Sequence, residues 1–156
     1  MDLFERKYIY ATCKGKPMPL EDMPDEVFSS GMLGVGYAIE PQGKTFYAPI
    51  SGKIENLADT KHAFTITSDD GVEVLVHIGI DTVELDGNGF KSLVKKDEKV
   101  DTGDPVIEID RKTILEGGYN LTSAVVITNP EIVCDIDYDF AHTVNEESVI
   151  ISYKNK

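Results

Sequence analysis

The chain has 156 residues, which is enough for one domain with a substantial core and too few for two comfortable ones. Hydrophobic residues make up 41% and charged residues 28%, the balance of an ordinary soluble globular protein. The 28 Asp and Glu against 15 Lys and Arg give a net charge of −13, which repels nucleic acid and anionic lipid and favours encounter with basic partners. No apolar run approaches the ~20 residues of a membrane span, and the first residues lack the basic start and apolar centre of a secretory signal. We therefore expect a cytoplasmic protein with a leader at residues 1–10 and a single domain at residues 11–156.

Hydrophobic periodicity predicts β-strands along most of the chain. Apolar and polar residues alternate in several short runs, and Gly and Pro separate these runs as turn residues do. In chain order we expect strands at residues 47–50, 53–57, 62–67, 72–78, 99–100, 106–109, 124–127 and 149–153. One short helix is expected at residues 111–116, capped by Asp110 and ended by Gly117 and Gly118. Many short strands with turns between them predict an all-β fold, an antiparallel sandwich or barrel with only short helical turns.

A faint internal repeat indicates that this fold is built from duplicated motifs. Residues 11–15 read Ala-Thr-Cys-Lys-Gly and residues 48–52 read Ala-Pro-Ile-Ser-Gly, and each copy continues to a Leu-x-Asp motif. Two matched copies are typical of a sandwich in which one motif occurs twice. We therefore expect a barrel-sandwich hybrid.

Two histidines interrupt neighbouring apolar strands. His77 lies between Val76 and Ile78 at the end of an apolar run, where a cationic ring would be costly to desolvate, so its neutral, nucleophilic form should prevail. His62 begins the preceding alternating run, and residues 68–71 (Ser-Asp-Asp-Gly) between the two runs are a turn signal. Equal counts back from this turn place the two imidazoles side by side at the open end of a hairpin. The pair is a candidate reaction centre.

Several motifs around these histidines identify a family. Residues 77–85 read His-Ile-Gly-Ile-Asp-Thr-Val-Glu-Leu, and residues 59–64 read Asp-Thr-Lys-His-Ala-Phe. Further matching segments lie at residues 21–28, 34–41, 48–52, 71–73, 87–91 and 125–129. In this order, over most of residues 11–153, the motifs resemble enzyme IIA of the glucose family in the bacterial sugar phosphotransferase system. The resemblance makes residues 11–156 a single enzyme IIA domain.

The resemblance implies a phosphoryl carrier without a required cofactor. Family members accept a phosphoryl group on a histidine from the histidine phosphocarrier protein and pass it to a cysteine of a permease IIB domain for sugar uptake. By position, His77 matches the phosphorylated residue, which reacts through Nε2, and His62 matches the second active-site histidine. Thr60 matches the hydroxyl beside it, Asp81 an aspartate four residues past the nucleophile, and Asp25 an acidic residue at the rim. The protein then meets a membrane only through the permease.

These roles agree with the chemistry of the residues. Phosphoryl transfer needs positioning and charge stabilisation more than covalent chemistry, and a neutral imidazole attacks phosphorus without a general base. If His77 attacks through Nε2, its Nδ1 proton needs an acceptor, for which the backbone carbonyl after Gly79 is a candidate. His62, oriented by Thr60, then donates its Nε2 proton to a phosphate oxygen.

The docking surface around the histidines should be apolar, because two protein sites must meet and exclude water. Five residues are candidates for this surface because of their positions, and each could equally be a core residue: Val27, Phe28, Leu75, Ile78 and Val83. An acidic rim would suit a basic phosphocarrier. We hypothesise that Asp25 and Asp81 pair with an arginine of the donor and keep the phosphorylated state high in transfer potential.

Two alternatives come from other classes of protein. In the first, His62, His77 and a carboxylate such as Asp81 hold Zn²⁺ with one open position. The family resemblance itself allows a partner-dependent zinc ion between the two histidines when the partner supplies a carboxylate. In the second, the chain is a non-catalytic regulatory module, since family relatives also bind metabolic enzymes and permeases according to phosphorylation state.

Overall fold

The structure, a computed structural model, describes residues 5–156, and it is all-β with two short helices and three 3-10 turns in that range. The strands are β1 (Lys7–Tyr10), β2 (Gly15–Pro19), β3 (Val35–Pro41), β4 (Thr45–Tyr47), β5 (Gly52–Leu57), β6 (Ala63–Thr67), β7 (Glu73–His77), β8 (Phe90–Ser92), β9 (Lys99–Val100), β10 (Pro105–Ile109), β11 (Ser123–Ile127), β12 (Val133–Tyr138) and β13 (Val149–Asn155). The helices are α1 (Glu26–Ser29) and α2 (Arg111–Glu116), and the 3-10 turns are η1 (Leu20–Asp22), η2 (Thr82–Leu85) and η3 (Pro130–Ile132).

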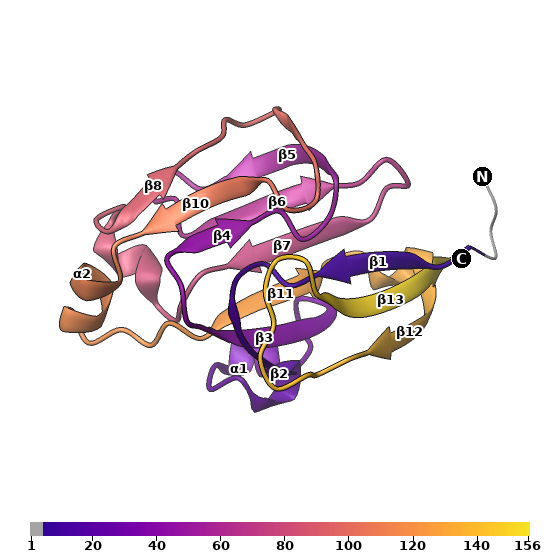
Figure 1. Ribbon diagram of the computed structural model, residues 1–156, viewed down its shortest axis with the longest axis horizontal. Helices are drawn as coiled ribbons and strands as arrows, with labels where there is room; N and C mark the ends of the chain where they lie inside the picture. Colours follow the sequence, from indigo (N-terminus) through magenta and orange to yellow (C-terminus); the bar gives the residue numbers. More distant parts are fainter. Residues whose placement is uncertain (1–4) are drawn as a thin grey trace.

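The strands form three antiparallel sheets. The largest has the order β2-β3-β11-β7-β6-β5-β9, and the smaller sheets are β4-β10-β8 and β1-β13-β12. Figure 1 shows β4, β10 and β8 lying over the large sheet, with β1, β13 and β12 beside them at the lower right. This arrangement confirms the predicted antiparallel sandwich. No helix among residues 5–156 has the length and apolar character needed to cross a membrane.

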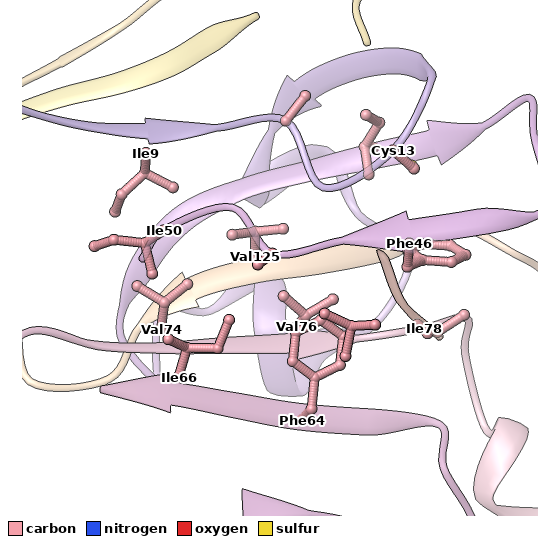
Figure 2. Close-up of a cluster of buried hydrophobic side chains, with 14 of the residues drawn as sticks. Ile9, Cys13, Phe46, Ile50, Phe64, Ile66, Val74, Val76, Ile78 and Val125 are labelled. Carbon is pink, nitrogen blue, oxygen red and sulfur yellow. The ribbon is translucent and has the colours of Figure 1, made fainter. Parts of the chain in front are cut away.

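The core lies between the sheets and follows the alternation of the strands. Phe64 and Ile66 of β6 and Val74 and Val76 of β7 are buried in one cluster, together with Val125 of β11. Figure 2 shows these side chains pointing into the same interior. Because successive residues of a strand face opposite sides, the residues between them lie on the other face of the large sheet.

That other face carries a second, smaller apolar cluster. Leu20, Met23 and Phe28, from the η1–α1 segment, pack on Ala124 and Val126 of β11. Leu75 of β7 is partly buried against the same cluster. Figure 1 shows α1 at the bottom of the view, beside β2 and β3. The η1–α1 segment therefore covers the face of β7 from which the side chains of Leu75 and His77 project.

The internal repeat is visible in the hydrogen bonds between its two copies. The Tyr10 amide donates to the Pro49 carbonyl at 2.9 Å, and the Tyr47 amide donates to the Thr12 carbonyl at 2.6 Å. Tyr10 and Tyr47 precede the two copies by the same number of residues, and Thr12 and Pro49 hold equivalent places within them. The two bonds are therefore equivalent under the repeat, and the two copies lie directly against each other.

Most strand ends lie within two residues of those expected, and two boundaries differ by more. Residues 7–10, placed within the leader, form β1 and pair with β13, so this strand belongs to the folded domain; residues 1–4 of the leader lie outside the described range. The strand expected at residues 47–50 ends at Tyr47, because the chain turns at Pro49, whose carbonyl bonds to β1 instead. The helix at residues 111–116 is confirmed, with the Asp110 side chain accepting from the Thr113 amide.

Candidate active site: a pair of facing histidines

His77 is the last residue of β7, and the alternation of that strand sets its direction. Val76 before it and Ile78 after it are fully buried in the main core, so the His77 side chain projects to the opposite face. Directly across the neighbouring strands lie Ala63 of β6 and Ala124 of β11. Opposite residues of antiparallel strands share a face, and two alanines there leave space for an imidazole ring.

His62 reaches the same place through the hairpin that joins β6 to β7. The Ile78 amide donates to the His62 carbonyl at 2.7 Å, which closes the open end of the hairpin. The two rings face each other with centroids 4.9 Å apart and planes at 84°. On another side, the Phe28 ring of α1 lies 5.0 Å from the His77 ring at an interplanar angle of 54°. The expected pairing of His62 with His77 is thus present.

The hydrogen bond at Nδ1 sets the tautomer of His77. Nδ1 lies 2.9 Å from the carbonyl oxygen of Gly79 itself, two residues along the chain. A carbonyl only accepts, so Nδ1 carries the proton. In the neutral ring Nε2 then has a lone pair and no proton, which is the form required for attack on phosphorus.

Thr60 contacts the Nδ1 of His62, as Gly79 contacts the Nδ1 of His77, but with a group that can donate a hydrogen bond. Its Oγ1 lies 2.5 Å from Nδ1 of His62, and Lys61 between them has a positive φ of 60° that makes the tight turn possible. A threonine hydroxyl can donate to Nδ1, and this leaves the proton of the neutral ring on Nε2. The pair therefore offers one nucleophilic nitrogen on His77 and one N–H donor on His62.

Burial keeps both rings neutral. Desolvation, reinforced by repulsion from a protonated His77, lowers the pKa of His62 to about 4. Desolvation also lowers the pKa of His77, although the hydrogen bond to Gly79 and the charges of Asp25 and Asp81 act in the opposite direction. The structure thus agrees with the expectation that a neutral His77 prevails at neutral pH.

These shifts predict how the protein responds to acid. The ring resonances of His62 in an NMR titration should stay in their neutral positions down to about pH 5 and move with a midpoint near 4, because burial opposes the charged form. The unfolded chain protonates its histidines near ~6.5, so it binds more protons than the folded chain between these values. Urea unfolding should therefore show stability falling as the pH drops from 6.5 towards 4, and this part of the loss should be absent in His62→Gln. A His62 midpoint near 6.5 would contradict the burial argument.

The two predicted carboxylates lie near the histidine pair. Asp25 caps α1 by accepting a hydrogen bond from the Val27 amide at 3.0 Å. Asp81 stands at the start of η2 in a left-handed conformation (φ 61°), and its side chain makes no capping bond. Both raise the pKa of His77 through their charge, which puts them within electrostatic reach of the ring. They form an acidic rim on two sides of the site.

Four of the five predicted docking residues divide into three groups by exposure. Val27 and Val83 are exposed, at 48% and 51%, and flank the site from α1 and η2. Leu75 is partly buried beneath α1. Phe28 is buried and contacts His77 from the side, so it forms a wall of the site more than an open surface.

Ile78 was wrongly placed on the docking surface. It is fully buried in the main core, because it follows His77 and faces the opposite side of the hairpin. Two other exposed apolar side chains, Met32 (78%) and Leu33 (37%), lie in the loop after α1 and were not singled out from the sequence. An apolar pair between Gly31 and Gly34 was the signal available for them.

The described side chains around the histidine pair do not form a complete zinc site. Among residues 5–156 no group of three or more His, Cys, Asp or Glu side chains is arranged to hold a metal ion. His62 and His77 supply two imidazoles, whereas zinc sites in proteins use at least three protein ligands. The three-residue site with Asp81 is therefore not formed by this chain alone.

The structure is thus an all-β sandwich that presents a neutral, half-buried histidine, with its Nδ1 bonded to Gly79, beside a second histidine, an arrangement compatible with carrying a group on an imidazole. Comparison with known proteins gives the family. Residues 7–133 match the model of the phosphoenolpyruvate-dependent sugar phosphotransferase system EIIA 1 family. The chain belongs to this EIIA family.

Similar proteins support the assignment over nearly the whole chain. A glucose-specific EIIA component of Mycoplasma capricolum is 45% identical over 121 residues, 78% of this chain and 79% of that protein. A glucose-specific EIIA component of Staphylococcus aureus is 38% identical over 144 residues, 92% of this chain and 87% of that protein. The solved structure of a glucose permease IIA from Mycoplasma capricolum superposes with a TM-score of 0.90 and 36% identity, covering 97% of this chain and 98% of that one.

The same domain also occurs within a larger protein. A β-glucoside-specific EIIBCA component of Bacillus subtilis is 40% identical over 126 residues. The match covers 81% of this chain and 21% of that protein.

Proposed function

We propose that this protein is a phosphoryl carrier that accepts a phosphoryl group on Nε2 of His77 from the histidine phosphocarrier protein. It then passes the group to a cysteine of a permease IIB domain during sugar uptake. One observation carries the proposal: the Nδ1 of His77 is committed to the Gly79 carbonyl at 2.9 Å, so the reactive lone pair is on Nε2 beside His62.

Acceptance of the phosphoryl group by His77 needs no general base, because no proton has to leave the attacking nitrogen. The Nε2 lone pair of His77 forms a bond to phosphorus as the bond between phosphorus and the donor's nitrogen breaks, and the Nδ1 proton stays in place. The imidazole gains positive charge in this step, which the Gly79 carbonyl stabilises through its hydrogen bond. His62 donates its Nε2 proton to a phosphoryl oxygen, so that charge on oxygen is stabilised by a donor already in position.

The surroundings of the pair favour a basic donor protein. Val27 and Val83 offer exposed apolar contacts on two sides of the site. Asp25 and Asp81 add negative charge at the rim, and the whole chain carries a net charge of −13. Such a surface steers a positively charged partner to the site and excludes water once the partner docks. We place this encounter in the cytoplasm.

The second partner follows from the family and the fused relative. The β-glucoside-specific EIIBCA component of Bacillus subtilis carries a domain like this chain in one polypeptide with IIB and IIC parts. We infer that the present chain delivers its phosphoryl group to a IIB domain of the same kind. In this proposal the choice of sugar belongs to the permease, because the role of the present chain is to carry the phosphoryl group. The transfer needs no metal, and a zinc ion between His62 and His77 would require a ligand from a partner.

A reconstituted labelling reaction tests the proposal. The protein is incubated with labelled phosphoenolpyruvate, enzyme I and the histidine phosphocarrier protein, and the product is treated with acid and with base. We expect one equivalent of label, lost in acid and stable in base as for a phosphoramidate, located on the peptide that contains His77. Label on another residue, or none at all, would contradict the proposed function.

A further inference from the structure

The loop that follows His77 is held by two buried hydroxyl groups on opposite ends of one peptide. This is the peptide between Ile78 and Gly79. The Thr82 hydroxyl donates a hydrogen bond to its carbonyl, on Ile78, and its amide, on Gly79, donates to the Ser123 hydroxyl at 3.1 Å. Ser123 and Thr82 are both completely buried. The chemistry described above uses neither of them.

Ser123 is fixed as an acceptor. Its hydroxyl donates its single proton to the Leu121 carbonyl at 2.8 Å, so only lone pairs of the oxygen remain for the Gly79 amide. Ser123 begins β11, one residue before Ala124, which pairs directly with His77. The serine therefore stands on the rigid central strand next to the nucleophile and holds the loop from there.

The next peptide is held as well. The Ile80 amide donates to the Asn120 carbonyl at 2.9 Å, and the Gly79 carbonyl at the other end of that peptide accepts from Nδ1 of His77. All four polar groups of the two peptides around Gly79 are thus engaged. The bonds to the other three groups fix the orientation of both peptides, so that the Gly79 carbonyl points at the imidazole.

Position 79 requires glycine, and the freedom of a glycine backbone means that hydrogen bonds must hold its peptides in place. Gly79 has a φ of 76°, and a Cβ there would lie 2.5 Å from the Thr82 side chain and 3.2 Å from the Asn120 carbonyl oxygen. A glycine has more rotational freedom than any other residue, so its two peptides turn easily unless they are held. Without the Ser123 bond, the Gly79 amide would be a buried donor without an acceptor, and the loop would rotate to find one.

We propose that Ser123 is a positioning residue that keeps the proton of His77 on Nδ1, and hence keeps Nε2 nucleophilic, by fixing Gly79. The expected effect on the rate of phosphoryl transfer rests on the proposed function. The expected effect on the tautomer of His77 rests on the geometry alone. Ser123 touches no reacting atom. It acts on His77 only through the two peptides that it and Thr82 hold.

The test compares Ser123→Ala with Ser123→Thr, which keeps a hydroxyl. The ¹⁵N resonances of the His77 ring report the tautomer in the unphosphorylated protein, and rapid-quench labelling reports the rate of phosphoryl acceptance. In Ser123→Ala we expect the ratio of Nε2–H to Nδ1–H tautomer to rise about tenfold, a change of about 1.4 kcal/mol, and the acceptance rate to fall in proportion to the fraction of His77 that leaves the Nδ1–H form. Ser123→Thr should restore both readings to within about twofold of wild type, since its hydroxyl makes the same bonds.

A matched control separates this effect from a general loss of stability. Thr12 is also completely buried, and its hydroxyl donates to the Tyr47 carbonyl at 2.8 Å, away from the loop. Thr12→Val should lower the free energy of unfolding without changing the His77 ring resonances. If Ser123→Ala fails to fold, Thr82→Val loosens the other end of the same peptide and should shift the tautomer in the same direction.

The outcomes are distinct. An unchanged Nδ1–H tautomer in the folded Ser123→Ala or Thr82→Val variant would overturn the proposal, as would a Ser123→Thr variant that behaves like Ser123→Ala. A tautomer shift in a protein whose wild-type form takes no label would support the positioning role and refute the proposed function instead.

Discussion

Replacement of His77 by alanine should abolish phosphorylation by the histidine phosphocarrier protein. His77 supplies the nucleophilic lone pair at the site, because its Nδ1 is bonded to Gly79 and its ring faces that of His62. Removal of a nucleophile leaves only background chemistry, so we expect the rate of label incorporation to fall by at least about four orders of magnitude. Single-turnover labelling with purified phosphorylated donor measures this directly.

The third histidine of the chain provides the matched control. His142 is exposed, in the segment between β12 and β13. His142→Ala should be labelled at the wild-type rate. If His77→Ala still accepted one equivalent of label, or if His142→Ala lost it, the nucleophile would have been assigned to the wrong residue. Circular dichroism of His77→Ala should show the β-sheet signal of the wild type, since the ring contributes little to the main core.

The parts of the fold that sequence alone predicts are those fixed by local pattern. The β6–β7 hairpin follows from two alternating runs around a Ser-Asp-Asp-Gly turn. Its register differs by one residue from the equal-count expectation, because Ala63 and not His62 lies directly opposite His77. The cap of α2 follows from Asp110 and two glycines. The contacts at the two histidines are also local, since Thr60 and Gly79 each lie two residues from the ring that they touch. The family resemblance pointed to Thr60, and the acceptor was expected at the backbone carbonyl after Gly79, where the structure has the carbonyl of Gly79 itself.

The parts that sequence alone does not predict depend on distant contacts. β1 was placed in a leader because residues 7–10 are too short to show a pattern, and only pairing with β13 makes them a strand. β12 alternates Asp with apolar residues, a pattern that reads as solvent-exposed until β13 pairs with it. Ile78 was misplaced because proximity to His77 in sequence says nothing about which face a residue takes once the strand ends.

The same reasoning explains why Ser123 was missed. Its oxygen lies 3.1 Å from the Gly79 amide, but 44 positions separate the two residues in the chain. A serine before an apolar strand is common and carries no signal of its own. Only the pairing of β11 with β7 brings it to the loop that holds the His77 tautomer. The nucleophile of such a site is visible in sequence, whereas the groups that orient it belong to the tertiary structure.

Replacement of His62 should separate the two transfers. His62→Ala keeps the His77–Gly79 bond and so the nucleophile, and we expect acceptance from the phosphocarrier to stay within about tenfold of wild type. Delivery to a IIB cysteine should fall by about a hundredfold or more, the usual cost of removing one donor that stabilises charge in the transition state. We expect this asymmetry because the thiolate brings a second negative charge towards the phosphoryl group, and the His62 ring faces the His77 ring that would carry the group.

Two further variants sharpen this prediction. His62→Gln retains an amide N–H of similar reach and should recover part of the delivery rate. Thr60→Val removes the partner at 2.5 Å from Nδ1 of His62 and leaves the ring free to turn, so we expect a smaller loss, about tenfold, in the same step. Equal losses of acceptance and delivery in His62→Ala would show that the residue only supports the structure of the site. A normal delivery rate in that variant would remove His62 from the transfer, and stabilisation of the phosphoryl group would then have to come entirely from the partner.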